Sequence, residues 1–191
     1  MARQRAGMQG LIAAVIMAVL AMASPREAGA GELVGAGRVA RAVVAAAQPL
    51  HAIDVVVTGI SDGDTAKVEL DGKSVRLRLA RIDAPEHEQP WGNRSEQSLR
   101  ELVWKKLVHI EWREVDRHGR PIVSMTIDGR DVSEEQVRRG LAWVYRAYSL
   151  DPDLIQLEER AREAKIGLWA DPKPVPPWEW RKLKRASDAI Q

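Results

Sequence analysis

A predicted β-strand ends abruptly inside the stretch Arg78-Leu79-Ala80-Arg81-Ile82-Asp83-Ala84-Pro85-Glu86. Apolar and charged residues alternate into this stretch, as in a strand with one buried face. Pro85 stops the strand because proline has no N–H to donate to a sheet, and it holds Ala84 in an extended conformation. The strand end therefore gathers one cation, Arg78, and two carboxylates, Asp83 and Glu86. On its own, so short a pattern is equally typical of a polar strand end followed by a loop.

Two further strands precede this one and bring more carboxylates toward it. Residues 53–60 are β-branched and end in the turn Ser61-Asp62-Gly63-Asp64, and residues 65–70 follow as a second strand. In a three-stranded meander the second strand leads away and the third returns, so we expect Asp64 and Asp83 at one edge. Two like charges held this close need a counter-ion, either a metal cation or a guanidinium.

The spacing of Arg78 and Asp83 predicts a break in the third strand. The two residues are five positions apart, so a regular strand would point their side chains to opposite faces. If both reach one site, the chain must bulge or bend between Ala80 and Ile82.

The rest of the pattern predicts two more strands and three helices. Strands are expected over residues 108–112 and 122–127. Capping and stop signals mark the helices: a capping box at Asn93-Arg94-Ser95-Glu96, a second capping box of Ser133 and Gln136 with a stop at Gly140, and a third helix from Asp151-Pro152 to Gly167. Five strands in this order, with a helix between the third and fourth, indicate an α+β fold: a five-stranded OB-fold barrel with three α-helices.

The N-terminus predicts export. Arg3 and Arg5 precede an apolar run over residues 11–23 that is too short to span a bilayer comfortably. We interpret residues 1–23 as a signal peptide, with cleavage as late as residue 30 as one alternative and an uncleaved membrane anchor as the lesser one. The mature protein is expected in the periplasm or outside the cell, as a monomer with no membrane segment.

The remaining chain divides into three parts. We expect a linker over residues 31–52, one folded domain over 53–170, and a tail over 171–191 that is first rich in proline and tryptophan and then basic. Residues 172–180 are expected to be extended. The basic residues that follow are expected to be a solvated tail rather than a binding arm: Arg181, Lys182, Lys184 and Arg185.

The composition excludes nucleic-acid binding by bulk charge. The chain has 29 basic and 27 acidic residues, and removal of the signal peptide with its two arginines leaves 27 of each. Affinity for phosphate must therefore come from locally placed arginines. Cysteine is absent, which excludes disulfides and thiolate metal sites. Phenylalanine is also absent, and four tryptophans are expected to fill the core instead: Trp104, Trp112, Trp143 and Trp169.

The clustered charges suit phosphodiester hydrolysis. A hard cation held by carboxylate oxygens polarises phosphorus, and a second carboxylate orients or deprotonates the attacking water. Guanidinium groups neutralise the charge that builds on the equatorial oxygens, and their planar fork matches phosphate better than a lysine does.

Five motifs then match a known family in order. They are Ile60-Ser61-Asp62-Gly63-Asp64-Thr65, Val75-Arg76-Leu77-Arg78, Ile82-Asp83-Ala84-Pro85-Glu86, Asp116-Arg117-His118-Gly119-Arg120 and Gly140-Leu141-Ala142. Over about residues 53–170 the chain resembles staphylococcal-nuclease-like (thermonuclease) domains. The resemblance implies a calcium-dependent enzyme that hydrolyses DNA and RNA endonucleolytically and leaves 3′-phosphate ends.

The resemblance also implies a calcium site. Asp64, Asp83 and the backbone carbonyl of Ala84 would hold the ion, with the carboxylate of Asp62 close behind them. Ala84 stands where the best-known members of the family carry threonine. The carbonyl is unchanged by that difference, so metal binding is expected to persist.

Three residues are implied to contact the substrate outside the reacting centre. His118 stands where the family carries a tyrosine near the nucleotide, which puts the substrate preference and the pH response in doubt. Tyr145 and Tyr148 fall near the family's nucleotide-facing tyrosines, with a spacing that is not identical.

Catalysis is implied to rest on Glu86, which activates the attacking water, and on Arg78 and Arg120, which clamp the scissile phosphate. The alternative function is a non-catalytic OB-fold module that binds nucleic acid or protein. Such a module would be expected to lose carboxylates or arginines from the site, whereas this chain keeps all five: Asp64, Arg78, Asp83, Glu86 and Arg120.

Overall fold

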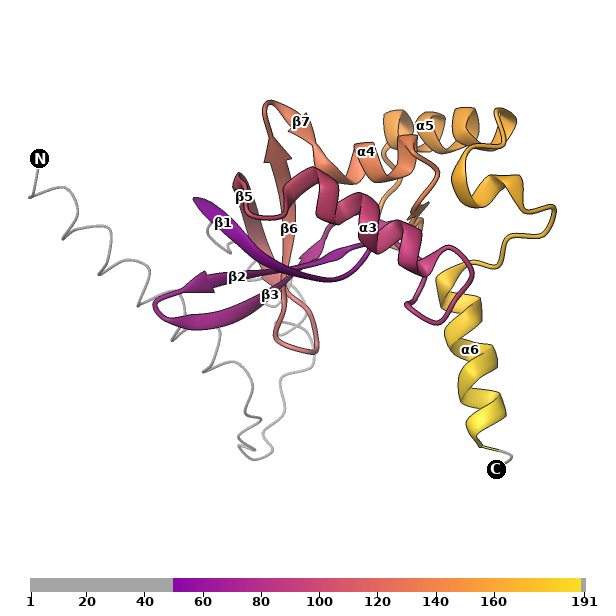
Figure 1. Ribbon diagram of the computed structural model, residues 1–191, viewed down its shortest axis with the longest axis horizontal. Helices are drawn as coiled ribbons and strands as arrows, with labels where there is room; N and C mark the ends of the chain where they lie inside the picture. Colours follow the sequence, from indigo (N-terminus) through magenta and orange to yellow (C-terminus); the bar gives the residue numbers. More distant parts are fainter. Residues whose placement is uncertain (1–49, 190–191) are drawn as a thin grey trace, which may run out of the picture.

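The computed structural model describes residues 50–189 (Figure 1). The predicted signal peptide and most of the predicted linker lie outside these residues. The last two residues assigned to the linker, 51 and 52, already belong to the first strand. Within the described part of the chain, no helix has the length and apolar character needed to cross a membrane.

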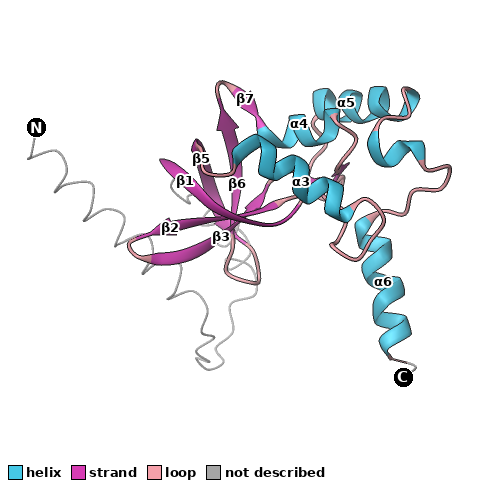
Figure 2. Cartoon of the chain, viewed as in Figure 1, coloured by secondary structure: helices cyan, strands magenta, loops and turns pink. Residues whose placement is uncertain are grey.

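Five strands form a closed barrel (Figure 2), which confirms the predicted OB-type fold. They are β1 His51–Asp62, β2 Thr65–Leu70, β3 Lys73–Leu79, β5 Leu107–Val115 and β6 Pro121–Ile127. Antiparallel neighbours follow the order β3-β2-β1-β5-β6, and a parallel pairing of β3 with β6 closes the barrel. Arg78 lies at this closure, because it pairs with Thr65 of β2 on one side and Ile122 of β6 on the other.

Three short strands and four helices surround the barrel. The short strands are β4 Ile82–Asp83, β7 Arg130–Asp131 and β8 Trp143–Val144. The helices are α3 Gly92–Val103, α4 Val132–Arg138, α5 Pro152–Glu163 and α6 Pro177–Asp188, with a 3₁₀ turn at Gly167–Ala170. The sequence predicted only three helices, and α6 is the one it missed. The expected extended segment stops at Pro176, and α6 begins at the next residue, Pro177. A proline fits the first helical turn because the N–H that it lacks would have no partner within the helix there.

Both predicted capping boxes are wrong. The first residue before α3 is Trp91, which has a φ of 74° and caps no N–H with its side chain. Helix α4 is capped by Asp131, whose side chain accepts a hydrogen bond from the N–H of Glu134. Ser133 and Gln136 therefore serve elsewhere, as does Ser95 within the first predicted box.

Those polar side chains tie the helices to the barrel end that carries Asp64 and Asp83. The hydroxyl of Ser95 in α3 donates to a carbonyl just beyond α4, at 2.6 Å. Ser133 donates to the carbonyl of Ala80 at 3.0 Å, and Gln136 donates to the carbonyl of Gly63 at 2.7 Å. Helix α4 thus fixes the main chain on both sides of the predicted site.

The predicted bend between Ala80 and Ile82 is confirmed. Arg81 has a φ of 70°, and the chain turns there from β3 into β4. The Arg81 guanidinium pairs with Asp131 and, at 2.8 Å, with Asp151, which holds the turn from the far side. Arg81 is therefore a structural residue, neither part of a solvated strand face nor of a substrate groove.

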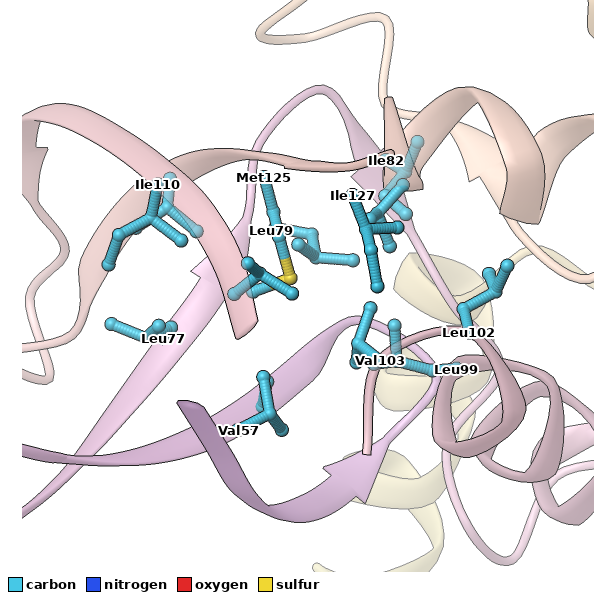
Figure 3. Packing of buried hydrophobic residues seen from close by; sticks show 14 of the residues in the cluster. Val57, Leu77, Leu79, Ile82, Leu99, Leu102, Val103, Ile110, Met125 and Ile127 are labelled. Atoms are coloured by element: carbon cyan, nitrogen blue, oxygen red, sulfur yellow. The ribbon is translucent and has the colours of Figure 1, made fainter. Parts of the chain in front are cut away.

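The main core fills the barrel and the space beneath α3. Leu99, Leu102 and Val103 of α3 are buried as predicted. Figure 3 shows Val103 beside the barrel residue Ile127, with Ile82 of β4 nearby. Because Ile82 is packed into this core, its neighbour Asp83 is anchored on a rigid element.

A second cluster involves four of the tryptophans, including Trp91, which packs against it. Trp143 and Trp169 are buried in it, and Trp178 of α6 packs against it. Trp112 is buried in the main core. Of the four tryptophans predicted to fill the core, only Trp104 is therefore not buried. Trp104 is 39% exposed and lies under the cationic ends of neighbouring side chains, so its assignment to the core is wrong.

Substitution of Gly140 with alanine is expected to destabilise the fold by about 3 kcal/mol. Gly140 has a φ of 62°, and a Cβ there would lie 2.2 Å from the carbonyl oxygen of Ile166. Gly72 has a similar φ of 71° with nothing within 4 Å, so Gly72→Ala is the matched control and should cost only about 1 kcal/mol. Urea unfolding measures both values, and equal losses would show that the contact with Ile166 is unimportant.

Candidate active site

Three charged side chains meet at the barrel end. Asp64 comes from the turn between β1 and β2, Arg78 from the end of β3, and Asp83 from β4 beyond the bend. One nitrogen of Arg78, Nη2, lies 3.2 Å from Oδ2 of Asp64 and 3.0 Å from Oδ1 of Asp83. The structure therefore brings the two predicted carboxylates to one guanidinium, which serves as a counter-ion between them.

These carboxylates are buried. Asp64 is 5% exposed and Asp83 is 2% exposed. Burial raises the pKa of Asp83 above its ordinary value, although hydrogen bonds from Arg181 and the charges of both arginines act in the opposite direction. Buried charges contribute little to stability compared with apolar packing, so their retention at this place indicates a function.

Asp62 lies behind Asp64, as predicted. Its Oδ1 accepts a hydrogen bond of 3.0 Å from the backbone N–H of Asp64. Burial and the negative charge of Asp64 raise the pKa of Asp62 to about 7. Asp62 therefore supports the turn that presents Asp64 and carries its charge only in part near neutral pH.

The main chain at Ala84 is part of the same cluster. Its N–H donates to Oδ2 of Asp64 at 2.7 Å, and the N–H of Leu79 donates to the Asp64 carbonyl at 2.8 Å. A Cβ at Gly63 would lie 1.7 Å from the Ser95 hydroxyl, so glycine is needed for α3 to approach this turn. The peptide of Ala84 is thus held within reach of both carboxylates.

Arg120 joins the cluster through a threonine. Its Nε donates to Oδ2 of Asp116 at 2.7 Å, and its Nη1 lies 3.4 Å from the hydroxyl of Thr65, which donates to Asp64 at 3.1 Å. Hydrogen bonds from Arg120 and from the N–H of His118 hold the pKa of Asp116 below its ordinary value, against the effect of burial. The sequence motif contained Asp116 and Thr65, but only the structure shows that they position Arg120.

Glu86 faces a residue that the sequence did not place in the site. Its Oε1 accepts a hydrogen bond of 2.7 Å from Nη1 of Arg181 in α6. The same guanidinium donates to both oxygens of Asp83, at 2.6 and 3.3 Å. The prediction that Arg181 belongs to a solvated tail is therefore wrong. No local signal could have found this contact, because 98 residues separate Arg181 from Asp83.

The three predicted substrate residues lie in two places. His118 is exposed on the β5–β6 loop, where its ring accepts a hydrogen bond from Arg117 and its backbone N–H donates to Asp116. The ring of Tyr145 lies 5.0 Å from that of Tyr148 and stacks on Trp178 at 5.6 Å. Tyr148 is 78% exposed. The tyrosines thus form an aromatic surface that α6 covers in part.

The oxygen atoms proposed as metal ligands fit a hard cation, although guanidinium groups bond to the carboxylate oxygens in this structure. Two buried carboxylates and a nearby backbone carbonyl are oxygen donors of the kind that calcium prefers. Within residues 50–189, no three histidine, aspartate or glutamate side chains are grouped closely enough to hold a metal ion as they stand. Arg78 and Arg181 lie between the carboxylates and supply the positive charge that such a group requires.

Comparison with known proteins agrees with this geometry. Residues 76–171 match the model of the family described as "Staphylococcal nuclease homologue". An "Uncharacterized endonuclease" of Escherichia coli O157:H7 is 44% identical over 129 residues, which are 67% of this chain and 84% of that protein. "Protein ParB" of Escherichia coli is 37% identical over 155 residues, 75% of this chain and 88% of that protein. A "Micrococcal nuclease" of Shigella flexneri is 36% identical over 140 residues, 68% and 80% of the two chains. With its barrel, its clustered charges and these relatives, the chain belongs to the staphylococcal nuclease family.

Proposed function

We propose that this protein is a calcium-dependent phosphodiesterase that hydrolyses DNA and RNA endonucleolytically and leaves 3′-phosphate ends. Family membership supports nuclease activity, and two of the relatives are named as endonuclease and micrococcal nuclease. The observation that carries the proposal is the convergence of buried Asp64 and Asp83 on Arg78 at the barrel closure. Packing alone gives no reason for three charges at that point.

Asp64, Asp83 and the Ala84 carbonyl would hold the calcium ion, with Asp62 fixing the turn that carries Asp64. A bound calcium ion would polarise the phosphoryl group and neutralise part of its charge. The N–H of Ala84 bonds to Asp64 at 2.7 Å, so the chain that leads to the Ala84 carbonyl passes directly beside the Asp64 carboxylate. Because the bend at Arg81 and the packed Ile82 fix β4, the position of Asp83 is set before any ligand binds.

The arginines and Glu86 would act on the phosphate and on the water. Arg78 and Arg120 reach the cluster from two elements, and each has guanidinium N–H groups beyond those that donate to protein acceptors. These groups would stabilise the charge that develops on the equatorial oxygens. Glu86 is only half-buried at the edge of the cluster, where a carboxylate has access to water and would accept its proton.

The aromatic surface would hold the nucleotide next to the scissile bond. Tyr145 and the exposed Tyr148 offer ring faces on which a base can stack, irrespective of its identity. His118, on the loop of Arg120, would contact the neighbouring phosphate or base. We further propose export to the periplasm or the medium, on the grounds of the N-terminal sequence pattern.

Cleavage of plasmid DNA and of RNA by the purified chain is expected in calcium and is expected to vanish in excess chelator. Magnesium should support less activity, because it demands a tight octahedral shell that calcium does not. Asp83→Asn should abolish cleavage in calcium, whereas Asp128→Asn, an exposed carboxylate in the β6–β7 turn, is the matched control. Undiminished cleavage in chelator would exclude the metal. Retention of nucleic acid without cleavage in any metal would favour the non-catalytic module.

A further inference from the structure

Helix α6 is fastened across the candidate active site by a few side chains. Figure 1 shows α6 beside the loop that leads into α3. The carbonyl of Val175, just before α6, accepts a hydrogen bond of 2.6 Å from Gln89 in that loop. At the second residue of the helix, Trp178 stacks on Tyr145. Further along, Lys184 pairs with Glu88 of the same loop.

Arg181 is the contact at the centre of this attachment. Its guanidinium bonds to both oxygens of Asp83 and to one oxygen of Glu86. Arg78 approaches Asp83 from the other side, at 3.0 Å. Every hydrogen bond that Arg181 makes to a side chain therefore goes to a carboxylate that the proposed function needs for metal or for water.

A calcium ion and Arg181 cannot share these oxygens. Calcium binds carboxylate oxygens at 2.3–2.6 Å, and an oxygen that accepts a guanidinium hydrogen bond in the same direction is not open to it. Trp178 excludes the substrate as Arg181 excludes the metal. Its ring lies at 15° to that of Tyr145 and covers the face on which a base would stack. One helix thus occupies both the metal-facing oxygens and the aromatic surface.

The attachment is weak enough to be reversible. Only Pro177 is buried among the residues of α6, and the side chain of Arg181 is still 35% exposed. The Lys184–Glu88 pair is exposed on both sides and contributes little to stability, whereas the Asp83 carboxylate that Arg181 meets is buried and keeps Arg78 as a partner when α6 leaves. The segment before α6 carries prolines at positions 172, 174 and 176, which makes it a semi-rigid connection without regular hydrogen bonding.

We propose that α6 is an autoinhibitory arm in which Arg181 occupies the Asp83 oxygens that would hold the divalent cation and pairs with Glu86, the carboxylate that would activate water, while Trp178 covers Tyr145. Calcium and a single-stranded nucleic acid displace the arm together, because each binds a surface that the arm covers. The inference rests on the proposed function, since it assigns Asp83 to metal and Glu86 to water. It adds that the resting protein holds its own site closed.

Calcium affinity, measured by calorimetry on the full chain without nucleic acid, tests the arm. A closed fraction of about 90% weakens the apparent affinity about tenfold, so Arg181→Ala should bind calcium about tenfold more tightly than the parent chain. Arg185→Ala is the matched control, because it removes the same charge from an exposed position one turn later in α6 and should leave the affinity unchanged. Thermal melting checks that each variant is folded.

Trp178→Ala separates the arm from a local effect of charge. This substitution keeps every charge but weakens the attachment of α6, so it should also tighten calcium binding, by a smaller factor than Arg181→Ala. If Arg181→Ala tightens binding and Trp178→Ala does not, Arg181 acts only as a nearby charge and the arm is refuted. Arg181→Gln replaces Arg181→Ala if that variant does not fold.

The failures of the arm and of the proposed function are distinguishable. If the parent chain binds calcium and cleaves DNA, but Arg181→Ala binds calcium no more tightly, the arm alone is wrong. If neither protein binds calcium and neither cleaves DNA, the metal assignment and the arm fall together.

Discussion

Replacement of Arg120 by lysine is expected to slow single-turnover cleavage on the order of a hundredfold, as for removal of one donor to a developing oxyanion. Lysine keeps the charge but loses the planar fork. In this protein Asp116 holds the Arg120 guanidinium through Nε, and Thr65 holds it through Nη1. These two fixed partners set the direction of the remaining N–H groups. A lysine ammonium cannot reproduce that orientation.

Arg117→Lys is the control for this prediction. Arg117 is exposed in the same β5–β6 loop, three residues before Arg120, and its Nε donates to the ring of His118. Its substitution should leave the single-turnover rate nearly unchanged. If Arg120→Lys cleaves at the parental rate at saturating calcium, Arg120 is an ordinary surface charge and does not stabilise the transition state.

Glu86→Gln is expected to reduce turnover by about 10²- to 10³-fold, because glutamine has the same shape but accepts no proton. The substrate and calcium affinities should change far less than the rate, since Glu86 is assigned to water rather than to metal. Glu88→Gln removes a carboxylate two residues later in the same loop, where it pairs with Lys184 of α6, and it should leave the rate within a few-fold of the parent.

Two outcomes would contradict the role of Glu86. A Glu86→Gln variant with parental turnover would show that another group activates the water. A loss of calcium affinity as large as the loss of rate would instead make Glu86 a metal ligand. Measurement of the single-turnover rate at several calcium concentrations separates the two.

Local chemistry was sufficient to predict the part of the fold that builds the site. Alternating residues and turn signals predicted the meander, and the antiparallel return placed Asp64 and Asp83 at one edge. The odd spacing of Arg78 and Asp83 predicted a bend, and the structure has it at Arg81. These predictions succeeded because each depends on residues that are close in sequence.

The features that were missed depend on partners far away in the chain. Ser133 and Gln136 have the spacing of a capping box, yet their side chains bond to carbonyls of other elements, and Asp131 caps α4 instead. Arg181 has the appearance of a solvated tail residue until α6 is placed against Asp83. Hydrogen bonds between distant segments leave no mark in the local pattern, so no reading of residues 172–185 alone would have found them.

Arg78 and Arg120 are proposed to act on one phosphate group from two elements of the barrel. Arg78 also holds two buried carboxylates, so lysine rather than alanine is the suitable substitution, because loss of a buried partner charge costs about 3–5 kcal/mol.

The direct measurement is a double-substitution cycle: single-turnover cleavage of one labelled oligonucleotide, at saturating calcium, by Arg78→Lys, Arg120→Lys and the double variant. Groups that act as a unit give non-additive losses, so the double variant should lose far less than the product of the two single factors. Losses that multiply, or parental rates in either single variant, would contradict a shared phosphate.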